Sequence, residues 1–444
     1  MKKYEQIIID LKLQIQEKKL AQGAKLPSIR QLSTQYQCNK DTVSKALLEL
    51  KYQNLIYAKN KSGYYVLGET STIQEETSDW IDFSNAMPDA QLFPYEDFRQ
   101  CLDQAIRTKE ANLFTYHLKH QGLDPLLESL QNYLIASQIY TEKENLVMTT
   151  GIQQALYILT HLPFPNGNEA IVIEQPTYHL MNQLVKAEQV PYYTIERTQQ
   201  GVDLAELEAL FKTKDIKFFY TIPRFQNPLG ISYTTQQKEK IVALAEKYDV
   251  YLVEDDYLGD FDQHQSHLPF HYYDYNQRVI YLKSFSKIIF PALRLGCCIL
   301  PDQLVESFTA KKMLIDYDTN LLSQKALSLY IDSGMFERHR QLLAQSYQKK
   351  ANLLNQTLQT LHVLPRESKL LDTKIAFHLK ASADSQQLFK ELANQKIRLS
   401  FLEDNFIQPS DSKRVQMDVR HMEYGKIVEN VTKCMTILHT YIQK

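Results

Sequence analysis

The first part of the chain places apolar residues at helical spacing and then at strand spacing. Apolar positions recur at helical intervals within residues 1–20, and Ser28 is suited to cap a second helix. A third helix is predicted over residues 40–50, with its apolar positions on one face. Residues 55–67 alternate around a polar turn, which predicts a β-hairpin. Three helices followed by a hairpin predict a winged helix-turn-helix over residues 1–67.

The rest of the chain alternates short apolar runs with helical stretches. Residues 68–79 are polar, acidic and without periodicity, so we interpret them as a linker. In the body, residues 80–444, helical stretches such as TTQQKEKIVALAEKY (234–248) separate buried-strand patterns, which predicts a parallel α/β sheet covered on both faces. Residues from about 325 to 444 are expected to form a smaller α+β subdomain. The strand patterns are EAIVIEQPTY (169–178), IKFFYTIP (216–223), DVYLVEDDY (249–257) and RVIYLKSFSK (278–287).

Composition and charge narrow the class of protein. The 444 residues are 44% hydrophobic and 23% charged, which is typical of a soluble protein of several domains. The sequence contains no apolar run long enough for a membrane span, no secretory signal and no metal-binding spacing. Five cysteines without a CxxC spacing indicate reduced thiols and a cytoplasmic location. The head, residues 1–67, has a net charge of +7 and the remainder −9, which indicates a polyanionic partner for the head.

The motifs of the head agree with that partner. The stretch KLPSIRQLSTQYQCNKDTVSKALLELKYQNLIYAKNKSGYYV (25–66) resembles the GntR-type winged helix through its LPS-x-R and TV-x-x-AL motifs. The resemblance implies that the partner is a double-stranded DNA operator. The start of the third helix would enter the major groove and the wing would approach phosphates. The candidate DNA contacts are Arg30, Lys40, Thr42, Ser44, Lys45, Lys61 and Gly63.

In the body, the stretch KSFSKIIFPALRLG (283–296) places a lysine and an arginine seven residues apart. A lysine whose pKa is lowered by burial and neighbouring cations forms Schiff bases with aldehydes. Pyridoxal 5'-phosphate carries an aldehyde, a phosphate, a ring nitrogen and a phenolic oxygen. We therefore expect Lys287 to hold the aldehyde as an internal aldimine and Arg294 to clamp the phosphate.

Other motifs supply partners for the remaining groups of this cofactor. A turn before a helix would present the backbone N–H groups of Gly151, Ile152 and Gln153 to the phosphate, together with Ser284 and Ser286. Asp255, at the end of a strand, would keep the ring nitrogen protonated. The phenolic oxygen would bond Asn227 and Tyr257, and Tyr178 would stack on the ring.

The order of these motifs resembles that of a fold-type I aminotransferase. TG-x-Q, E-x-P-x-Y, Q-N-P-x-G, E-D-D-Y, S-F-S-K and R-L-G follow each other along residues 80–444. The resemblance implies a homodimer in which Tyr116 reaches the phosphate in the neighbouring subunit. A GntR-like head on such a body is similar to the MocR/GabR family of bacterial transcription regulators. That likeness implies a body that binds the cofactor and senses a small molecule, usually an amine or amino acid.

One position departs from the family pattern. Aligning VQMDVRHMEYGKIVENV (415–431) with the family's I-R-L-G-F segment puts Gln416 where an arginine grips a substrate's α-carboxylate. Either that arginine is lost, or the alignment is wrong by one turn and Arg420 serves instead. If it is lost, ordinary amino acids bind poorly, and the effector could be pyridoxal phosphate itself.

We therefore expect a pyridoxal-phosphate-dependent transcription regulator, controlling vitamin B6 or amino acid metabolism, with at most weak transaminase activity. Two alternatives stay open at this point. One is a working aminotransferase that carries a DNA-binding head. The other is a DNA-binding protein whose body is only a dimerisation scaffold.

Overall fold

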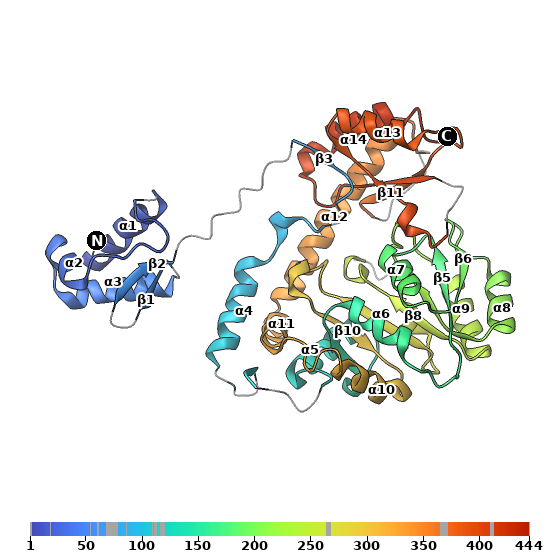
Figure 1. The fold of residues 1–444 in the computed structure, drawn as a ribbon, viewed down its shortest axis with the longest axis horizontal. Helices are drawn as coiled ribbons and strands as arrows, with labels where there is room; N and C mark the ends of the chain where they lie inside the picture. Colours follow the sequence, from blue (N-terminus) through green and yellow to red (C-terminus); the bar gives the residue numbers. More distant parts are fainter. Residues whose placement is uncertain are drawn as a thin grey trace. The chain divides into compact units, whose positions relative to one another are not determined.

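The structure is a computed structural model. It describes residues 2–17, 19–53, 55–59, 62–67, 79–85, 87–108, 110, 113–115, 120–262, 268–364, 372–408 and 413–443. The chain divides into two compact units, Met1–Asp79 and Trp80–Lys444, and each is described by itself (Figure 1). Two of the predicted site residues, Lys61 and Tyr116, lie outside the described residues.

The head has the predicted winged helix-turn-helix architecture. Its apolar positions form one core, to which Leu11, Leu32 and Leu47 contribute. Ser28 caps the second helix as expected, because its hydroxyl accepts a hydrogen bond from Gln31 N at 3.3 Å. The elements are α1 (Lys3–Gln16), α2 (Ile29–Gln35), α3 (Lys40–Tyr52) and the antiparallel hairpin of β1 (Ile56–Lys59) and β2 (Gly63–Val66).

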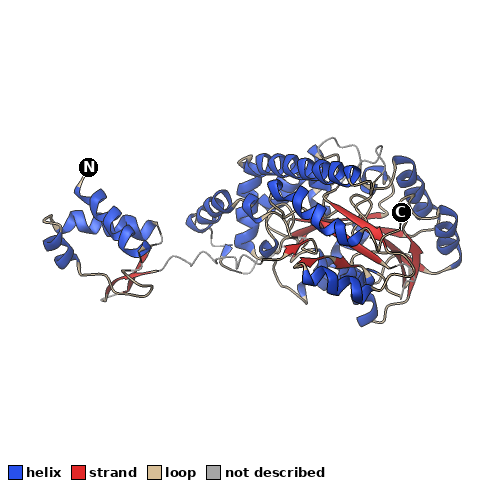
Figure 2. Ribbon diagram, turned by 90° about the horizontal axis from the view of Figure 1, so that it is seen from above, coloured by secondary structure: helices blue, strands red, loops and turns tan. Residues whose placement is uncertain are grey.

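The body is built around a large sheet with the strand order β4-β10-β9-β8-β7-β5-β6. Figure 2 shows helices on both faces of this sheet. Because side chains alternate along a strand, neighbouring residues such as Phe218 and Phe219 enter two different cores, one on each face. The strands are β4 (Leu146–Thr149), β5 (Ala170–Gln175), β6 (Tyr192–Glu196), β7 (Ile216–Thr221), β8 (Tyr251–Asp255), β9 (Val279–Ser284) and β10 (Gly296–Ile299).

The strands predicted from apolar runs are confirmed as β5, β7, β8 and β9, and all of their residues are buried. The expectation of an all-parallel sheet is wrong, because β10 pairs antiparallel with both β4 and β9. The reason is the connection: only the short segment between Ser284 and Gly296 joins β9 to β10. A parallel return needs a longer crossover, usually a helix.

The helices around the sheet separate its strands along the chain. The stretch predicted over residues 234–248 is confirmed as α9, which Thr234 caps by accepting from Gln237 N at 3.3 Å. These helices are α4 (Tyr95–Arg107), α5 (Asp124–Ala136), α6 (Ile152–His161), α7 (His179–Ala187), α8 (Leu204–Thr213), α9 (Thr235–Lys247), α10 (Asp302–Met313) and α11 (Leu321–Asp332). Among the described helices, none combines the length and the apolar character that crossing a membrane requires.

The C-terminal part of the body is a smaller α+β layer with its own core, which includes Leu358, Val415 and Leu438. Its sheet has the order β11-β14-β13, and a separate pair joins β12 to β3 in parallel. The first strand of the body, β3, therefore belongs to this C-terminal layer, although it precedes all the strands of the large sheet along the chain. The elements are α12 (Met335–Thr360), α13 (Ser385–Asn394), α14 (Ile427–Leu438), β3 (Ile81–Asp82), β11 (Lys374–His378), β12 (Ile397–Arg398), β13 (Ser400–Phe401) and β14 (Arg414–Asp418).

Candidate functional sites

The predicted cofactor residues gather where strands of the large sheet end. Asp255 is the last residue of β8, and Lys287 follows β9 by three residues. These two strands are parallel neighbours, with Asp255 opposite Leu282. Gly151 lies two residues beyond the end of β4. In open α/β folds, ligands bind at such carboxyl ends.

Lys287 has the electrostatic environment of a reactive amine. Its side chain is half-buried in the turn after β9. Burial, together with the positive charge of Arg420, lowers the pKa of Lys287 from 10.5 to about 8. A much larger fraction of the amine is therefore neutral near pH 7 than for an ordinary lysine.

Asp255 carries a buried acceptor that has no partner among the described residues. The residue is 2% exposed, and its Oδ2 accepts a hydrogen bond from Tyr220 Oη at 2.8 Å. Its Oδ1 is buried and accepts no hydrogen bond from the part of the chain that the structure describes. Burial raises the pKa of Asp255 to about 7 despite the Tyr220 bond. Buried oxygens of this kind are normally paired, so the site suits a ligand that offers an N–H group at this point.

The turn before α6, with Arg294 beside it, forms a positively charged cradle. Gly151 has φ +79° and ψ 165°, a conformation that glycine adopts readily. A Cβ atom at Gly151 would lie 2.9 Å from Arg294 Nη2, so the guanidinium packs directly over this glycine. Arg294 Nη2 also lies 3.4 Å from Gln153 Oε1, and the first N–H groups of α6, at Ile152 and Gln153, follow the turn.

The two predicted serines lie on the β9 side of this cradle. Ser284, the last residue of β9, is buried, and its Oγ accepts a hydrogen bond from Ser286 N at 3.2 Å. Ser286 immediately precedes Lys287, so one short segment carries both serines and this lysine.

Tyr178 contacts the cradle through Gln153. Its hydroxyl accepts a hydrogen bond from Gln153 Nε2 at 3.1 Å. Burial raises the pKa of Tyr178, and the charges of Asp255 and Arg294 both act on it. The tyrosine is therefore in contact with the cradle and within electrostatic range of Asp255.

Asn227 and Tyr257, predicted to bond a ring oxygen, lie close to the C-terminal layer. Asn227 is half-buried in a turn that a hydrogen bond from Gly230 N to Gln226 O closes at 2.6 Å. Tyr257 Oη donates to Phe225 O at 2.9 Å and accepts from Lys374 Nζ. The Tyr257 hydroxyl thus already has protein partners.

Next to Lys287 lies a group of charges that the motifs did not predict. Arg420 is 2% exposed, and its Nη2 donates to Asp372 Oδ1 at 2.8 Å. Asp372 Oδ2 lies 3.5 Å from Lys374 Nζ. Asp418 Oδ2 is 3.9 Å from Arg420 Nη2. All four side chains influence the pKa of Lys287, so this charged cluster (Asp372, Lys374, Asp418 and Arg420) lies within electrostatic range of the amine.

Gln416, the residue aligned with the family's arginine, lies on β14 opposite Ala376 of β11. Its Nε2 donates to Pro228 O, so the side chain reaches the turn that contains Asn227. Gln416 therefore occupies the side of the site where a ligand's outer groups would lie. Arg420 is held by acids of its own layer.

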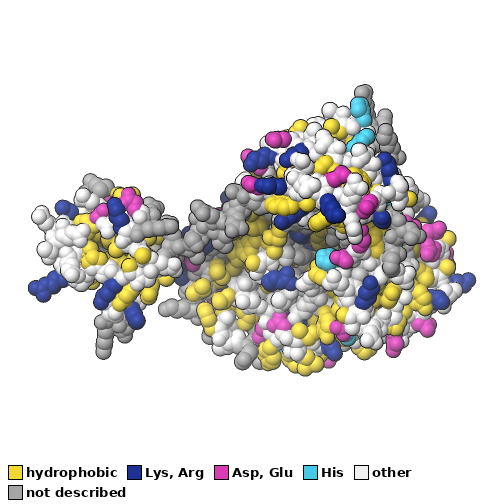
Figure 3. All heavy atoms as spheres, turned by 45° about the horizontal axis from the view of Figure 1, so that its top comes forward, with side chains coloured by type: hydrophobic (Ala, Val, Ile, Leu, Met, Phe, Trp, Pro, Cys, Tyr) yellow, Lys and Arg dark blue, Asp and Glu magenta, His cyan; other side chains and the backbone are white. Residues whose placement is uncertain are grey.

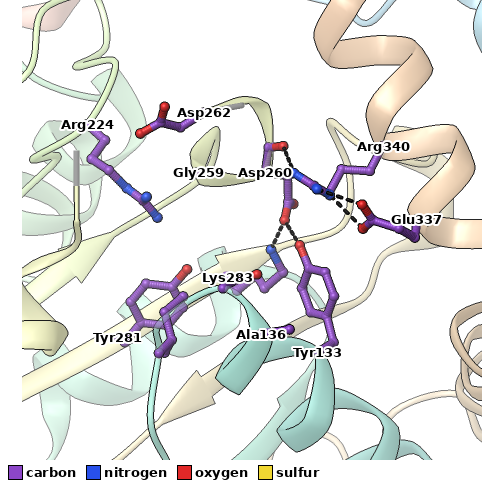
Figure 4. A pocket seen from close by; sticks show the side chains of 12 residues that line it. Tyr133, Ala136, Arg224, Gly259, Asp260, Asp262, Tyr281, Lys283, Glu337 and Arg340 are labelled. Carbon is purple, nitrogen blue, oxygen red and sulfur yellow. Dashed lines mark hydrogen bonds and ion pairs between the residues drawn. The ribbon is translucent and has the colours of Figure 1, made fainter. Parts of the chain in front are cut away.

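A polar cavity of about 160 Å³ lies beside β9 (Figure 4). Side chains that line it hold this strand in place. Lys283 of β9 points into it and forms an ion pair with Asp260 at 2.5 Å. Tyr133 of α5 donates to the same carboxylate, and Arg340 of α12 donates to Asp260 O at 3.2 Å. Arg340 also pairs with Glu337 at 2.7 Å. Through Asp260, these contacts connect β9 to α5 and α12. They do so at Lys283, which lies four residues before Lys287.

The described candidates for DNA binding lie on α2, α3 and the hairpin of the head. Figure 3 shows Lys and Arg side chains at the surface of the head. Arg30 and Lys40 are exposed, and Gly63, at φ +112°, begins β2. Two others are partly engaged. Lys45 Nζ lies 4.6 Å above the Tyr4 ring, and the Thr42 hydroxyl donates to Asn39, which caps α3. Ser44 is half-buried on the same helix.

The comparisons with known proteins match both parts of the chain. Residues 3–66 match the bacterial regulatory proteins of the gntR family, and residues 79–429 match the aminotransferase class I and II family. An uncharacterised HTH-type transcriptional regulator, YcxD of Bacillus subtilis, is 44% identical over 81% of each chain. The HTH-type transcriptional regulator NorG of Staphylococcus aureus is 25% identical over 95% of this chain and 100% of its own. Among solved structures, Pyrococcus horikoshii kynurenine aminotransferase has a TM-score of 0.74 at 24% identity, covering 82% of this chain and 92% of that one.

Proposed function

Since the chain belongs to the MocR/GabR type of transcription regulator, a GntR-type head fused to a class I and II aminotransferase domain, we propose that it senses through the site around Lys287. The head binds DNA, and the body is the cofactor-binding part. The cofactor is pyridoxal phosphate, and its binding alters the affinity of the dimer for its operator. A DNA target makes the cytoplasm the proposed place of action.

The observation that carries the proposal is the unpartnered Oδ1 of Asp255. This buried oxygen would accept the N–H of a protonated pyridine ring, a group that no described side chain supplies. Tyr220 holds the other oxygen of the same carboxylate and so fixes its direction. When bound, the cofactor supplies an aldehyde for a lysine and a ring that withdraws electrons.

The remaining residues hold the different parts of the cofactor. Lys287 supplies the amine, whose lowered pKa favours its neutral form. Tyr178 covers the ring, and Asn227 and Tyr257 border it on the side of the C-terminal layer. The phosphate is held by Gly151, Ile152, Gln153, Ser284, Ser286 and Arg294, where the glycine cradle and the guanidinium meet.

The finer parts of the proposal concern assembly and effector. We propose a homodimer in which Tyr116 of one subunit completes the phosphate site of the other. The effector is pyridoxal phosphate itself or a small amine or amino acid that replaces Lys287 at the aldehyde. An effector acts by binding one conformation of the dimer more tightly than the other.

The experiment compares operator binding with and without pyridoxal phosphate for the wild type, Lys287→Ala and Lys240→Ala. Lys240 is an exposed lysine on α9 and serves as the control. The wild type and the control are expected to show a near-visible absorption band, to lose it on borohydride reduction, and to change their DNA affinity with cofactor. A Lys287→Ala protein that responds to the cofactor as the wild type does would refute the proposal.

The same preparations test the alternatives. Steady turnover with amino acids and a keto-acid acceptor would favour a working aminotransferase. A protein that stays colourless in excess pyridoxal phosphate would favour a body that serves only for dimerisation.

A further inference from the structure

We infer that the site in front of Lys287 selects primary amines that carry no carboxylate on the amine-bearing carbon. The inference rests on the proposed cofactor site and names the class of effector that this site admits. It comes from the charged cluster of Asp372, Lys374, Asp418 and Arg420, together with Gln416.

The charges of the cluster are already balanced within the protein. Two acids face two bases, and Arg420 uses Nη2 on Asp372 at 2.8 Å and Nε on Thr373 Oγ1 at 3.3 Å. Asp418 lies 3.9 Å from the same guanidinium. A ligand carboxylate would add a third negative charge to a buried and neutral group. Such a charge is costly to bury without a partner of its own.

The position that could have supplied that partner is uncharged. Gln416 reaches the turn of Asn227 and donates its amide to Pro228 O. A primary amide carries two N–H groups, of which one donates to Pro228 O, and it carries no charge. A guanidinium at this position would offer two parallel N–H groups and a positive charge to a carboxylate.

Space near Arg420 is restricted as well. The cavity beside Asp372 and Arg420, which Tyr347 also lines, measures about 20 Å³. A volume of this size holds about one water molecule and no carboxylate group with its carbon atoms. This side of Arg420 therefore has no room for a ligand carboxylate.

One buried carboxylate oxygen of the cluster adds to the cost of burying a ligand carboxylate. Asp372 Oδ2 is buried and accepts no hydrogen bond from the described residues, while Lys374 Nζ lies 3.5 Å from it. This oxygen carries part of the negative charge of Asp372. A carboxylate would be repelled by it.

Exchange at the aldehyde needs no other reactant. The ligand's nitrogen forms a C=N bond to the aldehyde carbon while the C=N bond to Lys287 Nζ breaks. The two protons of the ligand's amine end on Lys287 Nζ, so atoms and charge balance. Any primary amine can undergo this exchange, and the neighbouring side chains decide which amine gains access.

The test titrates the cofactor-loaded full chain with ethanolamine and with L-serine, which differ only by the carboxylate. The shift of the near-visible band is recorded for each ligand, and free pyridoxal phosphate in solution provides the intrinsic difference in reactivity. After that correction, ethanolamine is expected to reach half-maximal shift at a concentration at least about tenfold lower than L-serine, as an unpaired buried charge implies. Equal responses, or a preference for L-serine, would overturn the inference.

A substitution tests the residue. Gln416→Arg is expected to reduce or reverse the preference, whereas Gln356→Arg, on the exposed side of α12, is expected to leave it unchanged. A preference that both variants retain would overturn the role of Gln416. Absence of any band before amine is added would instead refute the proposed cofactor site. A band that neither amine shifts would overturn only the amine inference.

Discussion

The glycine at the start of α6 gives a sharp test of the phosphate site. Gly151→Ala introduces a Cβ that would lie 2.9 Å from Arg294 Nη2 and 3.3 Å from Arg294 Cζ. The guanidinium must then move away from the N-terminus of α6, and the phosphate loses a charge-assisted partner. Such a bond is worth about 1.5–3 kcal/mol, so the Kd for pyridoxal phosphate is expected to rise roughly ten- to a hundredfold.

The substitution also strains the backbone, and this effect needs a control. An alanine at φ +79° costs about 1–3 kcal/mol by itself. Gly167 has a comparable φ of +70°, and a methyl group added there would meet nothing within 4 Å. It lies beyond the other end of α6. Gly167→Ala is therefore expected to lower Tm by a similar amount while leaving cofactor affinity unchanged.

The assay is an absorbance titration with pyridoxal phosphate, paired with thermal unfolding of the same samples without cofactor. A Gly151→Ala protein that binds the cofactor as tightly as Gly167→Ala would refute the assignment of the phosphate to this turn. Equal losses of affinity in both variants would show that general destabilisation, and not the displaced guanidinium, weakens binding.

Three further predictions concern the amine, the carboxylate and the head. Because burial and Arg420 lower the pKa of Lys287 to about 8, the rate of band formation with pyridoxal phosphate is expected to rise about tenfold per pH unit below pH 8 and to level off above it; stopped-flow absorbance would check this, and a flat profile would contradict it. Asp255→Asn removes the charge opposite the ring nitrogen and is expected to weaken cofactor binding at least about tenfold at an unchanged Tm, measured by the same titration; undiminished affinity would argue against this pairing. Arg30→Ala is expected to reduce the slope of log K against log salt for operator binding by about one, measured by fluorescence anisotropy, and an unchanged slope would exclude a phosphate contact.

Much of the fold could be predicted because its buried strands have a clear pattern. β5, β7, β8 and β9 are continuous apolar runs that end in polar residues, and such runs are typical of strands buried on both faces. The direction of β10 could not be predicted in the same way. The sequence of these four residues does not indicate whether the strand runs parallel or antiparallel to its neighbours. The direction depends on the length of the connection from β9 and on which strands still have an unpaired edge.

The residues of the site likewise fall into two groups: those that local sequence predicts and those that depend on contacts between distant segments. Residues such as Lys287, Asp255 and Gly151 belong to local motifs, because each acts through a turn or strand end that a few neighbouring residues determine. Tyr220, which holds Asp255, could be suspected as a polar side chain inside a buried strand, but its partner follows only from the pairing of β7 with β8.

The charged cluster is the opposite case, because no local motif predicts it, and it bears on the question that the motifs left open. Arg420 and Asp372 are 48 positions apart, and their 2.8 Å contact depends on how the ends of β11 and β14 meet. From the sequence alone, Arg420 could substitute for the missing arginine, since its charge is right and it lies one turn away. In the structure Arg420 donates to Asp372 and Thr373, so its charge is balanced within its own layer. The proposal that the site prefers amines without a carboxylate rests on this balance and on the uncharged Gln416.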